Sequence, residues 1–161
     1  RGENYVNGDI VNLPAGNTER AAQYIADAVG ADLFRVETVT PYPEDYYECT
    51  EKAKEEIRHH ARPELSRYLE DISAYDSIVV AGPCWWGTYP MAIFSLLERL
   101  DFQGKKVFPL VTHEGSGLGS ARGALKKYCA GAVIGEGLAI HGAEVESSKE
   151  KVIQWARKNL C

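Results

Sequence analysis

The chain lacks the long apolar runs and the basic clusters that mark two large classes of protein. None of its apolar runs approaches the roughly 18–20 residues that a membrane-spanning helix needs. With no signal peptide visible, the sequence therefore predicts a cytoplasmic protein with no membrane partner. The formal net charge is −5, and the densest basic group, at 58–62, is diluted by nearby glutamates. Nucleic-acid binding is not expected, because it requires a basic surface.

Several motifs of metal and nucleotide chemistry are also missing. No Cys-x-x-Cys pair occurs, and the histidines show no metal-binding spacing, so we expect no metal site. No P-loop lysine follows the glycine turn at 16, which argues against a magnesium triphosphate. No Gly-x-Gly-x-x-Gly follows an expected strand, so a dedicated dinucleotide domain is not predicted either. The cysteines are expected to be reduced thiols; they are Cys49, Cys84, Cys129 and Cys161.

What is present is an alternation of apolar runs with amphipathic stretches. Apolar residues make up 45% and charged residues 25% of 161 residues, which is typical of one soluble domain spanning 1–161. Strands are expected at 31–39, 76–82, 104–112 and, interrupted by glycines, 132–142. Helices are expected at 16–30, capped by Asn17 or Thr18, at 42–72 with a break at Pro63, and at 89–100, 121–129 and 145–160. Such alternation predicts an α/β fold with a parallel sheet covered on both faces.

Three loops follow strands, or possible strands, and so meet at the carboxyl edge of that sheet, where ligands bind. In the first, Gly16, Asn17 and Thr18 open a helix whose free amides suit a phosphate. The second, "GPCWWGTY" at 82–89, sets a tryptophan pair between Gly82, Pro83 and Gly87, and an indole face suits a planar ring. The third, "THEGSGLG" at 112–119, offers hydroxyls and uncovered amides from Thr112, Gly115, Ser116, Gly117 and Gly119. A phosphate, a planar ring and an electron-rich edge together describe flavin mononucleotide (FMN).

From about residue 10 to the end, the chain resembles the flavodoxin family, and most closely its small bacterial flavodoxin-like proteins. The residues that carry the likeness are "GNT" at a helix start, the run from "YDSIVVAGPCWWGTYPMAIF" to "THEGSGLG", and "GEGLAIHG". The resemblance implies a three-layer sandwich around an open five-stranded sheet of order 2-1-3-4-5 with FMN at its carboxyl edge. By that likeness Asn17 and Thr18 bind the phosphate; Pro83, Trp85, Trp86 and Gly87 flank the isoalloxazine; and Gly115, Ser116 and Gly117 meet its pyrimidine edge. Gly16, Cys84 and Thr112 complete the expected cofactor-binding set, and Trp85 is the favoured stacking residue.

One departure from the family concerns the first strand. A strongly apolar strand usually precedes the phosphate loop, whereas residues 1–15 are polar and are expected to form an extended loop segment. The first strand would then have preceded Arg1, or else "DIVNL" at 9–13 replaces it as a weak strand. Losing this central strand would leave backbone groups unpaired, at a cost of about 1–3 kcal/mol for each buried group.

The sequence thus predicts an FMN-binding electron-transfer protein that meets a redox partner protein or a small-molecule acceptor. Two alternatives stay open: an FMN-dependent NAD(P)H reductase of quinones or flavins, and a flavin-free interaction module on the same fold. No catalytic residue and no oligomeric state is predicted. His113 could donate to flavin or substrate, although loop histidines are usually solvated. Tyr42, Tyr46 and Tyr47 could form part of a lid, although packing of the next helix is the simpler interpretation.

Overall fold

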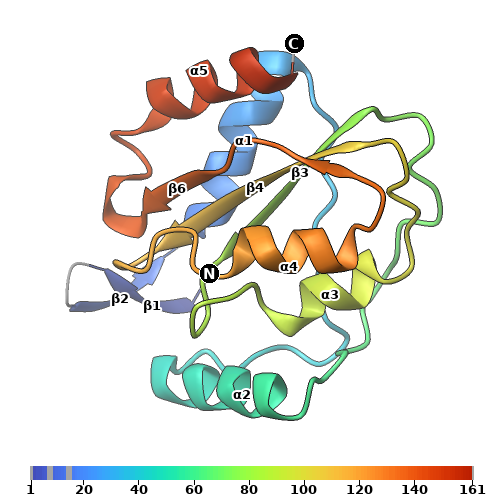
Figure 1. Ribbon diagram of the computed structural model, residues 1–161. Helices are drawn as coiled ribbons and strands as arrows, with labels where there is room; N and C mark the ends of the chain where they lie inside the picture. The colour runs from blue at the N-terminus through green and yellow to red at the C-terminus, as the bar shows by residue number, and fades with distance from the viewer. Residues whose placement is uncertain (1, 7–8, 14–15, 161) are drawn as a thin grey trace.

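The computed structural model describes residues 2–6, 9–13 and 16–160, and its centre is an open parallel sheet (Figure 1). Strand β4 (Lys106–His113) lies in the middle of this sheet. On one side it pairs with β3 (Ser77–Pro83), and on the other with β5 (Val133–Ile134) and then β6 (Leu138–His141), all in parallel. The expected strand at 132–142 is therefore present as two short pieces that form one interrupted edge.

Helices cover both faces of the sheet, as the alternating pattern predicts (Figure 1). On one face lie α1 (Asn17–Val29) and α5 (Lys149–Leu160), around a core that includes Ile25, Leu110 and Val152. On the other lie α3 (Met91–Leu97) and α4 (Ala121–Tyr128), around a core that includes Phe94, Val107 and Leu125. Helix α2 (Tyr46–Arg58) lies below this second layer, and a short 3₁₀ turn, η1 (Gly142–Glu144), follows β6.

The start of α1 differs in detail from the sequence expectation. The N-cap is Gly16, not Asn17 or Thr18, and no side chain of the cap bonds to the helix. The Gly16 amide donates instead to Glu19 Oε2 at 3.4 Å. Asn17 and Thr18 are the first two residues of the helix, so their amides have no carbonyl within it to bind. The helix start therefore keeps outward donors, as an anion site requires.

Two predicted elements are not formed. Residues 31–39 were expected to be a strand, but they run irregularly and make only an isolated bridge between Thr38 and Leu65. A strand requires a neighbour along its whole length, and among the described residues only 64–66 pair with this segment, at residues 37–39. Likewise, the helix expected after Pro63 is absent. Residues 64–66 instead bond to the 31–39 segment, through Val39 N to Glu64 O and Ser66 N to Glu37 O.

The N-terminal residues form a hairpin rather than a plain loop. β1 (Gly2–Val6) and β2 (Asp9–Leu13) pair antiparallel, with Gly2 opposite Leu13 and Val6 opposite Asp9. This pair is a separate two-stranded sheet. "DIVNL" is therefore a strand, but it does not replace the first strand of the parallel sheet. The described chain is an α/β fold with an open parallel sheet in which β3, β4 and the β5–β6 edge follow the 3-4-5 part of the flavodoxin order.

Candidate functional site

The first and third loops meet at the carboxyl edge of the sheet. β4 carries Thr112 to the end of the central strand, and α1 begins beside it. The hydroxyls of Thr18 and Thr112, 94 residues apart, lie 2.7 Å from each other and share a hydrogen bond. Thr112 is buried, whereas Asn17 and Thr18 are half-buried. The expected phosphate loop is thus fixed to the strand that leads into the glycine-rich loop.

Hydrogen bonds join the second loop to the third loop and to Ser120, which follows it. Cys84 N donates to the Thr112 carbonyl at 2.8 Å. Ser116 Oγ donates to Cys84 Sγ at 3.1 Å, and the Gly87 carbonyl accepts from both Ser120 N, at 2.8 Å, and Ser120 Oγ, at 2.9 Å. Gly119 has φ +54°, and a Cβ there would collide with the Gly87 carbonyl, so only glycine permits this approach. All three expected loops therefore form one continuous surface at this edge.

The two tryptophans have different surroundings. Trp85 is half-buried and meets the ring of Tyr42 edge-on, with centroids 5.0 Å apart and planes at 80°. Trp86 is 56% exposed. Its indole N–H donates to the Thr50 carbonyl at 2.9 Å, and the Lys54 ammonium lies 5.3 Å from its ring centroid. The contacts of both indoles thus run towards residues 42–54, whereas Cys84 and Gly87 make the contacts with the third loop.

The turn that carries the tryptophans is tight and strained. Trp85 and Thr88 exchange two backbone hydrogen bonds, of 2.7 and 3.2 Å. Trp86, between them, has φ +54°, a left-handed conformation that a bulky residue rarely adopts. The next residue, Gly87, has φ +84°. The strained turn holds the Trp86 ring at the surface.

Behind Trp85 lies a buried polar pair that sequence reasoning did not single out. The Tyr42 hydroxyl donates to Glu56 Oε2 at 2.8 Å, and Glu56 is only 7% exposed. Burial raises the pKa of the Glu56 carboxyl and, with the Glu56 bond, that of Tyr42, so the phenol remains a donor. Tyr42 was predicted as a lid or packing residue. The period of α2, which turns Glu56 to the same buried side as Ala53, was the signal that could have identified its partner.

Two histidines stand at the ends of β4 and β6, beside the start of α1. The His113 and His141 rings are 5.7 Å apart, and His141 Nε2 lies 3.5 Å from Glu114 Oε2. His113 Nδ1 accepts from Gly115 N at 2.9 Å. Burial, together with the neighbouring His141, lowers the pKa of His113, so this imidazole is neutral at pH 7. A Cβ added to Gly142 would lie 2.7 Å from Asn17 Nδ2, which places η1 against the helix start.

Gly115 and Gly117 lie in the same glycine-rich loop, with φ +133° and +63°. Residues that carry a side chain rarely adopt such backbone angles. A Cβ at either position would meet nothing within 4 Å. Glycine is therefore required at both positions by conformation, and no side chain covers the loop there. Pro83 is half-buried at the carboxyl end of β3, immediately before this surface.

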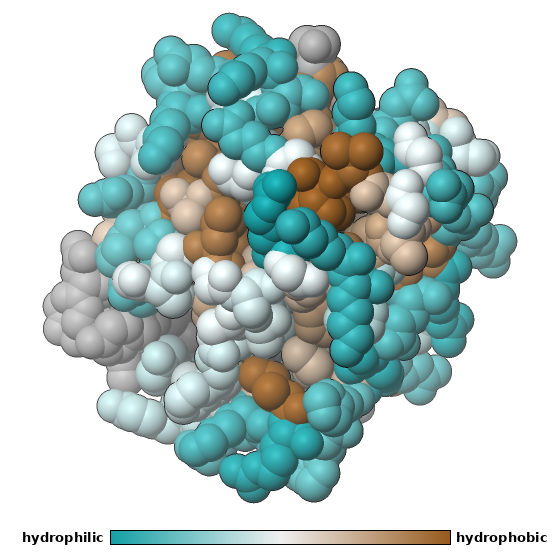
Figure 2. Space-filling view, viewed as in Figure 1, coloured by the Kyte–Doolittle hydropathy of each residue, from teal (hydrophilic) through white to brown (hydrophobic). Residues whose placement is uncertain are grey.

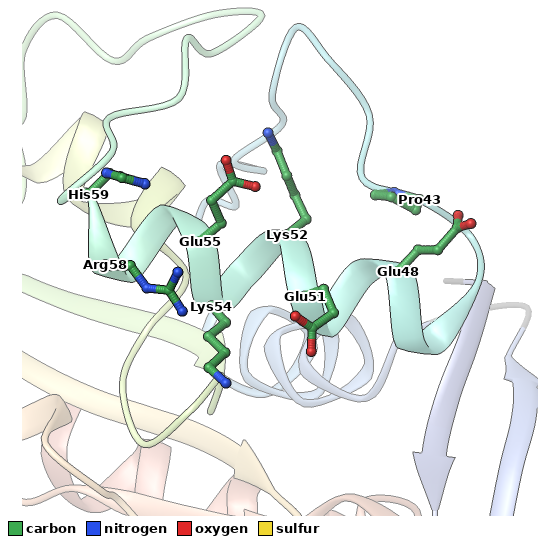
Figure 3. A pocket seen from close by; sticks show the side chains of 8 residues that line it. All are labelled: Pro43, Glu48, Glu51, Lys52, Lys54, Glu55, Arg58 and His59. Atoms are coloured by element: carbon green, nitrogen blue, oxygen red, sulfur yellow. The ribbon is translucent and has the colours of Figure 1, made fainter.

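The hollows elsewhere on the molecule have less specific linings. One of about 550 Å³ borders α2, where Figure 3 shows acidic and basic side chains projecting along the helix, among them Glu51, Lys52 and Arg58. A second, of about 320 Å³, lies near the amino ends of the strands, between residues 70–73 and 99–105. Both hollows are lined by charges of both signs and by no buried set of donors, so they select no class of ligand. We therefore place the candidate site at the carboxyl edge.

Hydrophilic side chains dominate the rim of the face shown in Figure 2, and apolar ones show towards its middle.

In the described parts of the chain, no three His, Cys, Asp or Glu side chains are grouped so that they could hold a metal ion. Over the same residues, no helix has the length and apolar character needed to cross a bilayer.

Comparison with known proteins places the chain. A search of curated proteins found no match. Among solved structures, two proteins assigned as flavoproteins are similar to this chain. The one from Bacteroides uniformis is 30% identical and has a TM-score of 0.74; the match covers 87% of this chain and 90% of that protein. The one from Bacteroides eggerthii is 26% identical and has a TM-score of 0.69; the match covers 87% of this chain and 92% of that protein. A flavoprotein from Lactobacillus acidophilus, solved in complex with FMN, shares the fold at 21% identity, with a TM-score of 0.63 over 81% and 89%. The family model described as flavodoxin matches residues 12–159, so the chain belongs to the flavodoxin family.

Proposed function

We propose that this chain binds FMN non-covalently at the carboxyl edge of its sheet and transfers electrons to a partner. Family membership supports a flavin, and the fold is shared with the Lactobacillus acidophilus flavoprotein that was solved with FMN. The observation that carries the proposal is the joining of the three loops, through Thr18 with Thr112, Cys84 with Ser116, and Gly87 with Ser120.

The residues present fit such a cofactor. Gly16, Asn17 and Thr18 offer a helix start to the phosphate, where amide donors and the helix dipole favour negative charge. The glycine-rich loop offers the amide of Gly117 to a ring that carries carbonyls, whereas the Gly115 amide already donates to His113 Nδ1. Trp85 and Trp86 offer flat faces, and stacking on an aromatic ring adds about 0.5–1.5 kcal/mol beyond area burial.

Bound FMN would supply the redox chemistry, and the protein would supply orientation and electrostatics. Tyr42 and Glu56 hold the indole of Trp85 in one orientation, and the left-handed turn holds that of Trp86. Glu114 lies in the glycine-rich loop, and a carboxylate there disfavours additional negative charge on a bound ring. The net charge of −5 favours a basic redox partner, with association that weakens as salt is added.

The test is a titration of FMN into the flavin-free protein, followed by tryptophan and flavin fluorescence. Trp155 is buried in the core on the α5 side, so replacing it by Phe leaves Trp85 and Trp86 as the only indole reporters. We expect saturable quenching in this background. Trp85→Leu and Trp86→Leu should each weaken binding, whereas the Trp155→Phe control should not. Equal affinity in all four proteins would refute the site.

A separate measurement distinguishes a carrier from a reductase. The FMN-loaded protein is mixed with NADPH under anaerobic conditions, and the visible absorbance of the oxidised flavin is followed. We expect no rapid bleaching, because no dinucleotide-binding sequence follows a strand. Rapid bleaching would assign the chain to the FMN-dependent reductases. Absence of any FMN binding would favour the flavin-free interaction module.

A further inference from the structure

His113 and His141 end neighbouring strands and accept hydrogen bonds in the same way. They stand opposite each other in the register of β4 and β6. His113 Nδ1 accepts from the Gly115 amide at 2.9 Å, and His141 Nδ1 accepts from the Ala143 amide at 3.4 Å. In both cases the donor is the backbone amide two residues further along the chain, at the carboxyl edge of the sheet.

The bond from Gly115 fixes the protonation state of the His113 ring. A backbone N–H can only donate, so an Nδ1 atom that accepts from it carries no proton. The neutral ring of His113 therefore holds its proton on Nε2. A second proton has to enter at Nδ1, where it would set two donors against each other, so protonation of His113 must break the bond to Gly115.

Charged and titratable groups face His113 from its own loop, from β6 and from η1. The ring centroid of His141 lies 5.7 Å from that of His113. Glu114 is the next residue in the chain, with Oε2 3.5 Å from His141 Nε2, and Glu144 belongs to η1. Burial and His141 lower the pKa of His113, while Glu114 and Glu144 act in the opposite direction. Protonation of His113 is therefore disfavoured at pH 7 but becomes accessible in mild acid.

The start of α1 borders the same group. A Cβ on Gly142 would lie 2.6 Å from Glu114 Oε1 and 2.7 Å from Asn17 Nδ2, so both side chains lie against Gly142. Asn17 is uncharged, and Glu19 in the same turn of the helix is paired with Arg35 at 2.8 Å. The histidines thus stand beside residues that we propose to bind a phosphate, where a change in their charge acts on an anionic ligand.

The Gly115 amide belongs to the loop that is expected to meet the ring of the cofactor. Gly115 has φ +133° and a Cβ there would meet nothing within 4 Å, so this part of the backbone has room and freedom to turn. While His113 is neutral, the amide is directed at Nδ1 and not at a ligand. A proton on Nδ1 releases the amide and adds a positive charge beside an anionic cofactor, and both changes favour binding of FMN.

We propose that His113 is a positioning residue, which makes the Gly115 amide available to the cofactor when Nδ1 takes up a proton from the solvent. This role rests on the proposed FMN site and adds one proton to its binding equilibrium. The imidazole becomes an imidazolium on binding in mild acid, and the same proton returns to the solvent on release. Because FMN favours the protonated ring, its affinity for the protein rises as the pH falls.

The first measurement follows the nitrogen-15 resonance of the Gly115 amide in the flavin-free protein between pH 8 and pH 5. In the parent protein we expect a titration whose midpoint lies below pH 6.5, the ordinary value for histidine. His113→Asn keeps an acceptor on Cγ, where Nδ1 is attached, but cannot gain a proton, so its resonance should stay at the parent's pH 8 position. His59→Asn, at the end of α2, is the matched control and should titrate like the parent.

The second measurement compares the FMN affinities of the parent and His113→Asn proteins at pH 8 and pH 5.5. Ionisation of the FMN phosphate is the same for both proteins, so it cancels in their ratio. We expect equal affinities at pH 8 and at least about threefold tighter binding by the parent at pH 5.5. The ratio should be smaller for riboflavin, which lacks the phosphate charge.

A Gly115 resonance that does not move with pH in the parent would overturn the proposal. So would an equal movement in His113→Asn, because another group would then control the loop. An FMN affinity ratio that is the same at both pH values would also overturn it, because the loop and the cofactor would then be independent. If FMN binds neither protein, the proposed function fails, whereas the amide titration, which needs no flavin, still decides whether His113 controls Gly115.

Discussion

At the scale of single residues, the surface that carries the tryptophans depends on a buried carboxyl group. Glu56 accepts from Tyr42, and Tyr42 supports Trp85 edge-on, so three residues from different parts of the chain act as one unit. A buried carboxyl needs such a donor, because burial without a hydrogen bond is costly. The sequence alone identified the tryptophan pair as a candidate site. It did not identify the support that Tyr42 and Glu56 give to Trp85, because this support depends on how residues 42–56 fold against the turn.

Replacing Tyr42 by Phe tests this support. The substitution keeps the ring beside Trp85 and removes the bond to Glu56, so we expect the free energy of unfolding to fall by roughly 1–3 kcal/mol. Urea denaturation measures the change. Tyr47→Phe is the matched control, since Tyr47 is 67% exposed and should tolerate the loss of its hydroxyl. Equal effects of the two substitutions would show that the Tyr42 bond contributes nothing specific.

His113 gives the protein a predictable response to pH. Its pKa is lowered from 6.5 in the folded state by burial and by His141, so folding favours the neutral ring. The unfolded chain then binds more protons below about pH 6.5, and stability from this group is present above that pH and is lost as the pH falls. We expect His113→Gln to lose less stability than the parent protein between pH 7.5 and 5.5 in parallel urea titrations. A parallel pH dependence in the two proteins would contradict this assignment.

At the scale of elements, β3 forms a strand because its side chains pack against the helices on both faces of the sheet. Gly82 illustrates how close the fit is, since a Cβ there would lie 2.7 Å from Ile93 Cδ1 and 2.8 Å from Tyr89 Cδ1. Tyr89 is fully buried, and its hydroxyl donates to the Val80 carbonyl at 2.7 Å, so it cannot easily move away. The connection from β3 to α3 is therefore locked against the strand.

Gly82→Ala should consequently destabilise the protein by about 1–3 kcal/mol through overpacking. The control is Gly123→Ala in α4, where a Cβ meets nothing within 4 Å, and which should instead stabilise the helix by about 0.5–1 kcal/mol. Thermal unfolding of both variants measures these opposite signs. A destabilised Gly123→Ala protein would show that α4 depends on glycine for another reason.

Sequence patterns predicted correctly those helices and strands whose apolar residues pack against other described residues. The apolar runs of β3 and β4 and the amphipathic face of α1 all meet a core, so local pattern and tertiary structure agree. Residues 31–39 carry an equally good strand pattern, but a ladder needs a partner, and alternation alone cannot say whether one is present. The hairpin at 2–13 was missed, although Asn-Gly at 7–8 between two extended runs is a recognised turn signal.

At the scale of the whole molecule, sequence reasoning predicted which loops would meet because the carboxyl ends of parallel strands share one edge. It could not predict the contacts that fix them, such as the bond between Thr18 and Thr112, because these depend on the relative heights of α1 and β4. Nor could it predict that Trp85 is half-buried and Trp86 exposed, because this difference depends on the left-handed turn at Trp86.

Because the three loops come from α1, β3 and β4, a ligand that binds them all should stabilise the entire fold. FMN at a free concentration 100 times its dissociation constant should raise the free energy of unfolding by about 2.7 kcal/mol, provided that only the folded chain binds it. Urea denaturation with and without FMN measures this increment, and Trp85→Leu protein at the same FMN concentration should gain less. A large increment in hydrogen-exchange protection confined to residues 42–54 would mean that FMN contacts only the tryptophan turn and the α2 side. Protection that extends to α1 and to the end of β4 is what a ligand spanning all three loops requires, because each of them then opens only when the ligand leaves.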